Sequence, residues 1–365
     1  MSFLKNLFGK KELPIKTNQD FWNWFIKHER AFYITVKENL NVEKDFLDKL
    51  SPKLNELREG FLFLTGMQDD HTVELVLTAD GIIKNIVFVE ELVTATPSIT
   101  GWKFTALKPA MDNDQLSIEM GGYAFNQEKI QFYSHDLPAY PDEIDITLVH
   151  ADITIANKDE LTNGCYIFLD NFLGELSFAT DIDHITVIGT ADAEKELIPI
   201  SKLPDFIRWR EKEFIEKYEG VLQNTENGTH AVFEGKTKKG NVFIATINTA
   251  ILEWEQKASH PWVMIVEIAY DSKRTNGLPA GGGFEFLEEI ESDIAVELKD
   301  YEGYLLIGHQ SGENVREVYY ACKDFRKPSK LIDSLTHQYA HTTKISFDIY
   351  KDKYWQSFRR FEKEV

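Results

Sequence analysis

The spacing of apolar side chains divides the chain into helical and extended segments. Phe21, Trp22 and Phe25 begin a helical repeat, whereas Ile345 and Phe347 follow the alternation of a strand. Helical spacing predicts helices over residues 18–39, 41–59, 87–95, 159–173, 206–218, 284–299 and 329–340. Alternating or continuous apolar runs bounded by turn residues predict strands over residues 61–65, 73–77, 102–107, 116–120, 129–134, 144–150, 184–188, 231–233, 242–247, 262–270, 304–309, 315–322 and 345–349.

The order of these elements predicts an α+β protein of two domains. From residue 262 onward the order is strand, helix, strand, strand, helix, strand, the βαββαβ order of a ferredoxin-like sandwich. We expect a four-stranded antiparallel sheet with both helices on one face, led by a β-hairpin around 236–240. Ile345, Phe347 and Ile349 of the final strand should point toward the helices, and the opposite face should be covered by the hairpin or by the N-terminal domain. Ser51 and Pro52 predict a restart within the second helix, and Ser311-Gly312 a turn between two strands.

Changes in composition suggest the domain boundaries. We expect a flexible N-terminal tail over 1–16, an N-terminal α+β domain of unknown role over 17–196, a connecting helix and loop over 197–227, and the ferredoxin-like domain over 228–365. The strand and helix order of the first domain repeats that of the second, which would be consistent with a remote duplication.

Composition and charge narrow the function classes. The net charge is -20, which disfavours the phosphates of nucleic acid and anionic membranes, so we expect neither partner. An acidic chain could instead bind a basic protein. The sequence has no run of about 20 apolar residues, the length that a membrane-spanning helix needs. Two cysteines, Cys165 and Cys322, are too few for a disulfide framework, and we expect each to be a small buried residue. We therefore expect a cytoplasmic protein.

Several polar motifs resemble sites, yet each has a simpler structural interpretation. The run Gly277-Leu-Pro-Ala-Gly-Gly-Gly283 precedes a helix but lacks the lysine of a phosphate-binding loop. Asp69-Asp70-His71 and Asp181-Ile-Asp183-His184 offer metal-ligand types without a third ligand at diagnostic spacing. We interpret these three runs as turns and a strand entry, and expect no metal, no cofactor and no catalytic residue.

One cluster of charged and aromatic residues follows the third strand from the end. Strand alternation places Arg316 and Tyr320 on one face and Glu317 on the other. The interpretations are a structural salt bridge with aromatic packing, or a binding surface. The candidate binding residues are His309, Glu313, Arg316, Glu317, Tyr320 and Asp324.

These residues also carry a family resemblance. Asn276-Gly-Leu-Pro279, the segment Gly308-His-Gln-Ser-Gly-Glu-Asn-Val-Arg-Glu-Val-Tyr-Tyr320 and the terminal Asp352-Lys-Tyr-Trp355 resemble the bacterial domain of unknown function 695. Ser311 stands where that family's pattern has threonine. The resemblance covers about residues 228–361. The family is itself similar in layout to the regulator of ribonuclease activity B, which would imply a protein-binding role.

Together these observations favour a protein-interaction or regulatory module without catalysis. The alternatives are an enzyme that acts on a small substrate through Glu313, Arg316 and Tyr320, and an immunity-type inhibitor of a basic toxin. A deep pocket around this cluster would favour the enzyme, and an occluded sheet would favour the binding module.

Overall fold

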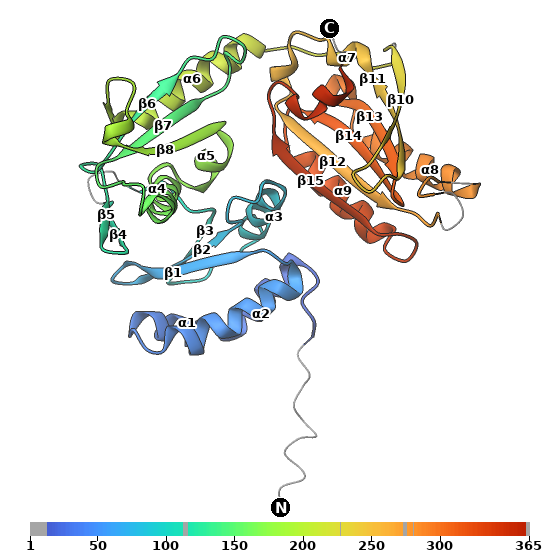
Figure 1. Ribbon diagram of the computed structural model, residues 1–365. Coiled ribbons are helices and arrows are strands. Elements are labelled where there is room, and N and C mark those ends of the chain that lie inside the picture. Colours follow the sequence, from blue (N-terminus) through green and yellow to red (C-terminus); the bar gives the residue numbers. More distant parts are fainter. Residues whose placement is uncertain (1–12, 112–115, 227, 273–275, 280, 363–365) are drawn as a thin grey trace, which may run out of the picture. The chain divides into compact units, whose positions relative to one another are not determined.

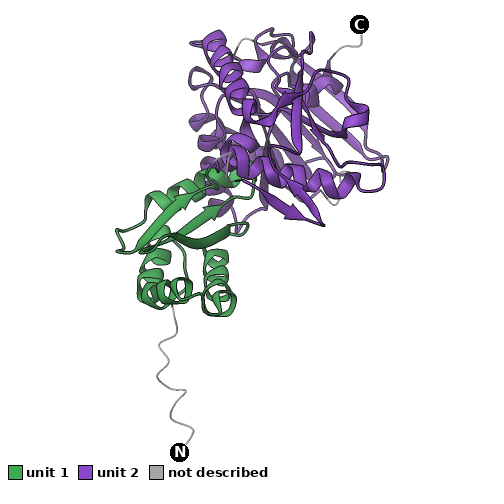
Figure 2. Cartoon of the chain, turned by 90° about the vertical axis from the view of Figure 1, so that its left-hand side faces the viewer, with its two compact units in different colours: residues 1–109 green, residues 110–365 purple. Residues whose placement is uncertain are grey.

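The computed structural model describes residues 13–111, 116–226, 228–272, 276–279 and 281–362, which form two compact units. Unit 1 spans Met1–Pro109 and unit 2 spans Ala110–Val365 (Figures 1 and 2). The expected N-terminal tail lies almost wholly outside the described residues. The expected boundary between 197 and 227 stays a prediction.

Unit 1 joins a helical hairpin to a small mixed sheet. Its elements are α1 (Asn18–Lys37), the π-helix η1 (Glu43–Leu47), α2 (Asp48–Leu57), β1 (Leu62–Asp69), β2 (Thr72–Thr78), α3 (Ile83–Thr94) and β3 (Trp102–Ala106). Strand β2 pairs antiparallel with β1 and parallel with β3. Thr17 and Asp20 form a capping box that starts α1. Pro52 lies inside α2, and the predicted restart at Ser51 occurs instead at Asp48, where the π-helix ends.

An aromatic core holds unit 1 together. Phe25 packs edge-on against Trp102 with ring centroids 5.0 Å apart, and Phe32 packs against Phe46 at 4.5 Å. The indole N–H of Trp22 donates to the carbonyl of Leu92 at 2.8 Å, so its buried polar group is satisfied. The aromatic residues that define the first predicted helix are therefore core residues.

Unit 2 begins with a second small α+β region. Its elements are β4 (Ile118–Met120), β5 (Tyr123–Phe125), β6 (Ile130–His135), β7 (Asp145–His150), α4 (Lys158–Leu173), α5 (Glu175–Thr180), β8 (His184–Gly189), β9 (Ile198–Pro199) and α6 (Leu203–Tyr218). The sheet order is β8-β7-β6-β9, with β7 and β8 parallel. Apolar side chains of α4 and α6 share one core with this sheet.

The C-terminal part of unit 2 is a six-stranded antiparallel sheet with helices. Its elements are β10 (His230–Lys236), β11 (Val242–Asn248), α7 (Thr249–Leu252), β12 (Trp262–Ala269), α8 (Gly282–Glu297), β13 (Tyr304–Gly312), β14 (Val315–Cys322), α9 (Arg326–Gln338) and β15 (Ile345–Lys351). The strand order is β10-β11-β13-β14-β12-β15. Short 3₁₀ turns complete unit 2: η2 (Thr190–Asp192), η3 (Ile200–Lys202), η4 (Lys257–Ser259), η5 (Asp300–Glu302) and η6 (Gln356–Phe361).

The prediction of four strands was wrong in number, because the leading hairpin extends the sheet. Strand β11 pairs with β13 from Phe243 to Ile247, which adds β10 and β11 at one edge. The turn between β13 and β14 lies at Glu313-Asn314 instead of Ser311-Gly312. Both turn residues have positive φ, a conformation that Asn tolerates better than most side chains.

Both faces of this sheet are covered. Helices α8 and α9 cover one face with apolar residues that include Leu287, Ile290 and Ile332, all fully buried. We expected the opposite face to be covered by the hairpin or by the N-terminal domain. Instead, Trp355 and the 3₁₀ helix η6 cover it, with Phe358 packing 5.4 Å from Tyr319. A hairpin that hydrogen-bonds to the sheet edge cannot also fold over its face.

Candidate functional site

The centre of the predicted cluster is a buried ion pair. Arg316 of β14 donates from Nη1 to Oε1 of Glu291 on α8 at 2.8 Å, and only 4% of Arg316 is exposed. Nδ1 of His309 lies 3.2 Å from the other oxygen of Glu291. Tyr320 lies on the same side of β14 and is buried, which raises the pKa of its hydroxyl. This part of the cluster therefore connects helix α8 to strand β14.

The remaining candidate residues lie elsewhere. Glu313 sits in the β13–β14 turn, where it accepts from Oγ1 of Thr237 at 2.9 Å. Glu317 points to the opposite side of β14 and accepts from the hydroxyl of Tyr319. Asp324 accepts from the backbone N–H of Arg326 at 2.7 Å, at the start of α9. His309, Arg316 and Tyr320 thus share one side of the sheet, and the other three do not join them.

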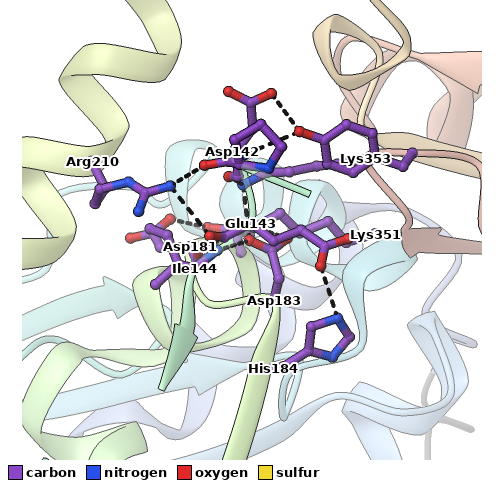
Figure 3. Close-up of polar contacts among 12 residues, drawn as sticks. Asp142, Glu143, Ile144, Asp181, Asp183, His184, Arg210, Lys351 and Lys353 are labelled. Carbon is purple, nitrogen blue, oxygen red and sulfur yellow. Dashed lines mark hydrogen bonds and ion pairs between the residues drawn. The ribbon is translucent and has the colours of Figure 1, made fainter. Parts of the chain in front are cut away.

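A denser polar cluster connects the first part of unit 2 to the end of β15 (Figure 3). Asp183, at the start of β8, lies 2.9 Å from Nζ of Lys351 and 2.8 Å from Nζ of Lys353. Asp183 also accepts from the backbone N–H of Ile144 at 2.7 Å. Burial alone would raise the pKa of Asp183, but the two lysines outweigh it and hold the pKa low.

Asp142 forms the second centre of this cluster. Its carboxylate accepts from Nζ of Lys217 at 2.7 Å and from the hydroxyl of Tyr218 at 2.8 Å. The hydroxyl of Tyr354 donates to the same carboxylate at 2.6 Å. These hydrogen bonds overcome the effect of burial and lower the pKa of Asp142. The carboxylate is therefore ionised and held on several sides.

Two further groups of the cluster have displaced pKa values. Burial raises the pKa of Glu211 on α6 to about 7, and its hydrogen bond with Asp181 adds to the effect. Burial, together with the neighbouring Lys351, lowers the pKa of Lys353 to about 8, although Asp183 opposes the change. Perturbed groups of this kind occur both in functional sites and in structural ion-pair networks.

These groups border a pocket of about 420 Å³. One wall comes from α5 and α6, with Thr180 and Phe214. The other comes from the starts of β12 and α9 and the end of β15, with Trp262, Phe325 and Lys351. In contrast to the Arg316 ion pair, this pocket combines charged groups with space for a small molecule.

The potential metal ligands and the two cysteines can be located in the described part of the chain. Among those residues, no group of three His, Cys, Asp or Glu side chains could hold a metal ion. Cys165 and Cys322 are buried, and burial raises the pKa of the Cys165 thiol to about 12. No described helix combines the length and apolar character needed to cross a membrane.

The C-terminal region matches a known protein family. Residues 236–361 match the model of a family of unknown function, DUF695. The C-terminal region of the chain therefore contains a DUF695 domain, which confirms the resemblance inferred from its motifs. Neither the curated proteins nor the solved structures contain a match to the chain.

The sequence pattern around Asp183 predicted a strand entry but not the partners of its carboxylate. One signal was present in the terminal motif Asp352-Lys-Tyr-Trp355, in which four successive side chains make specific contacts. Asp352 accepts from the N–H groups that start η6, and Lys353 pairs with Asp183. Tyr354 donates to Asp142, and the indole N–H of Trp355 donates to the backbone carbonyl of His260. The motif contributes Lys353 and Tyr354 to the cluster. Their partners, Asp183 and Asp142, lie about 170 and 212 residues earlier in the chain.

Proposed function

We propose that this chain is a cytoplasmic protein-interaction module without catalysis, and that the edge of its C-terminal sheet binds an extended basic segment of a partner protein. The observation that carries the proposal is the open edge strand β10, in a sheet that carries the acidic helix α8 on one face. In the described part of the chain, β10 pairs with β11 alone.

The buried ion pair between Arg316 and Glu291 supports a binding role over an enzymatic one. Arg316 and Tyr320 are buried between β14 and α8, where a substrate would have to displace Glu291. The strand order β15-β12-β14-β13, with the hairpin added at the β13 edge, supports our proposal that this region is a ferredoxin-like sandwich. In such an arrangement the edge strand has backbone N–H and C=O groups that a partner can reach.

The edge has the features of a strand-addition site. An exposed edge strand presents unpaired N–H and C=O groups with which a partner segment can pair. Val232 is 70% exposed and Ile244 is 36% exposed, and Ile244 lies opposite the exposed Glu234. On the other side of β10, Phe233 packs on Phe361 at 5.5 Å, which fixes the strand to the core.

Charge complementarity points to a basic partner. Thr246 on β11 pairs with His309, whose ring reaches Glu291 of α8, so the face with Val232 and Ile244 is the face that carries α8. Helix α8 contains six acidic residues and no lysine or arginine. A partner strand that carries basic as well as apolar side chains on the face shared with α8 would meet Val232, Glu234 and the acidic helix favourably.

Affinity capture with matched variants tests this proposal. The variant Val232→Lys/Glu234→Lys reverses the character of the edge, and Glu194→Lys changes one exposed charge outside the C-terminal sheet. We expect a protein from the native lysate to bind the wild type and Glu194→Lys but to be lost from the edge variant. Unchanged capture by an edge variant with a wild-type melting temperature would contradict the proposal.

A synthetic peptide provides the second arm. A ten-residue peptide in which lysine and valine take turns along one face of the strand, with threonine between them, should bind the wild-type chain at least tenfold more tightly than the edge variant, about 1.4 kcal/mol. The same peptide with alternate amides N-methylated cannot complete the backbone ladder and should not bind. Equal binding of the two peptides would argue against strand addition.

A further inference from the structure

We propose that the pocket between α6 and the start of α9 binds a small organic anion with an apolar or aromatic body. This site is separate from the β10 edge and does not depend on the protein-binding role. The pocket has a volume of about 420 Å³, which lies within the range of small-molecule sites.

The walls of the pocket carry an excess of positive charge. Its cations are Arg210, Lys323, Arg326, Lys351 and Lys353. Its carboxyl groups are Asp142, Asp181, Glu211 and Asp324, and Asp183 lies behind the two C-terminal lysines. When Glu211 is protonated, the walls therefore carry five cations and three carboxylates, with Asp183 as a fourth carboxylate behind them. This local excess stands out in a chain with a net charge of -20.

Several of the carboxylates are already committed to contacts within the protein. Asp142 is held by Lys217, Tyr218 and Tyr354. Asp324 accepts from the backbone N–H of Arg326. An anion that enters the pocket would thus meet carboxylates whose charge is partly neutralised, and it would share Arg326 with Asp324, and Lys351 and Lys353 with Asp183. It would also lie near the N-terminal end of α9, where the helix dipole favours negative charge.

The remaining wall is apolar. Trp262 and Phe325 pack edge to face with centroids 4.9 Å apart, and Phe214 lies across from them on α6. Ile215 lines the same pocket and is 66% exposed, which places an apolar side chain at its rim. An inorganic ion would leave these surfaces uncovered, whereas an aryl carboxylate or a similar anion would cover them and reach the cations.

Glu211 should make binding depend on pH. The groups that act on it are Asp181, from the segment after α5, and Lys351 and Lys353, from the end of β15. Loss of its proton adds a negative charge to the pocket, so binding of an anion should weaken as the pH rises from 6 to 8. The change Glu211→Gln keeps the side chain neutral and should reduce this dependence, and the part that remains near pH 8 comes from Lys353, whose pKa is lowered to about 8.

Titration of the full-length chain with 8-anilinonaphthalene-1-sulfonate, followed by fluorescence, tests the site. In Lys323→Gln/Arg326→Gln we expect the dissociation constant to rise at least tenfold, while Lys212→Gln, an exposed change on α6, leaves it unchanged. Lys323→Gln alone serves if the double variant does not fold. The neutral analogue N-phenyl-1-naphthylamine should bind wild type and variants alike.

Competition identifies the chemistry of the ligand. Benzoate should displace the fluorescent probe from the wild type at a lower concentration than inorganic phosphate does. Equal binding of the anionic probe to the wild type and the cation variants would overturn the proposal. So would displacement by phosphate at lower concentrations than benzoate, because the apolar wall would then contribute nothing.

Discussion

Replacement of Asp183 by asparagine should destabilise unit 2 strongly. The change is nearly isosteric, and the amide oxygen can still accept from the N–H of Ile144. It removes the carboxylate that lies within 2.9 Å of both Lys351 and Lys353. The Asp183 side chain is 7% exposed and that of Lys353 is 5% exposed, so water cannot replace the lost partner.

The expected loss in the free energy of unfolding follows from this burial. Removal of one partner from a buried ion pair costs about 3–5 kcal/mol. Lys353 already has its pKa lowered to about 8, and it can escape part of the cost by losing its proton. We therefore expect the lower end of the range, ~3 kcal/mol. That loss corresponds to roughly 6–12 °C in melting temperature for a unit of this size.

The loss of stability caused by Asp183→Asn should also depend on pH. A lysine whose folded pKa lies below its unfolded value of 10.5 binds fewer protons in the folded state between those two values. Stability consequently rises with pH across that window. Without Asp183 the folded pKa of Lys353 falls further and the window begins lower. The destabilisation caused by Asp183→Asn should thus be largest near pH 6 and smaller near pH 10.

Differential scanning calorimetry of the full-length chain at both pH values measures these effects. Asp192→Asn, at an exposed position, is the matched control and should leave the melting temperature unchanged. Lys353→Met in the Asp183→Asn background should restore part of the stability, because the uncompensated charge is then absent. A loss below 1 kcal/mol, or a loss that Lys353→Met does not reduce, would refute the role assigned to this ion-pair cluster.

Three further outcomes are expected. Trp355→Ala opens a cavity beneath η6 and removes the hydrogen bond to His260, so thermal unfolding should show a loss of about 3–5 kcal/mol; a loss under 1 kcal/mol would mean that η6 does not contribute to the core. Glu291→Gln leaves the buried Arg316 without its carboxylate and should cost ~3 kcal/mol by urea unfolding, whereas Glu288→Gln, at an exposed position on the same helix, should cost nothing measurable. The chain should not bind single-stranded RNA at physiological salt, since the face opposite α8 and α9 is covered by Trp355 and Phe358; micromolar affinity in a filter-binding assay with steep salt dependence would disprove this.

The sequence by itself determined most of the local structure. The periodicity around Phe21, Leu287 and Ile345 predicted helices and a strand where the structure has α1, α8 and β15, because apolar spacing reports which side of an element is buried. The motifs near Asn276, Arg316 and Trp355 were sufficient to indicate the DUF695 region. The face of β15 that points toward the helices followed from alternation alone.

Only the tertiary structure decided which elements and charges meet. Whether the leading hairpin covers the sheet or extends it depends on backbone hydrogen bonds between β11 and β13, which periodicity does not encode. The partner of Arg316 is Glu291, one of six acidic residues on α8 that the sequence alone does not distinguish. Asp183 meets Lys351 and Lys353 across about 170 residues of chain. A charged pair separated so far in sequence leaves no local pattern, because its energy arises only when folding removes both groups from water.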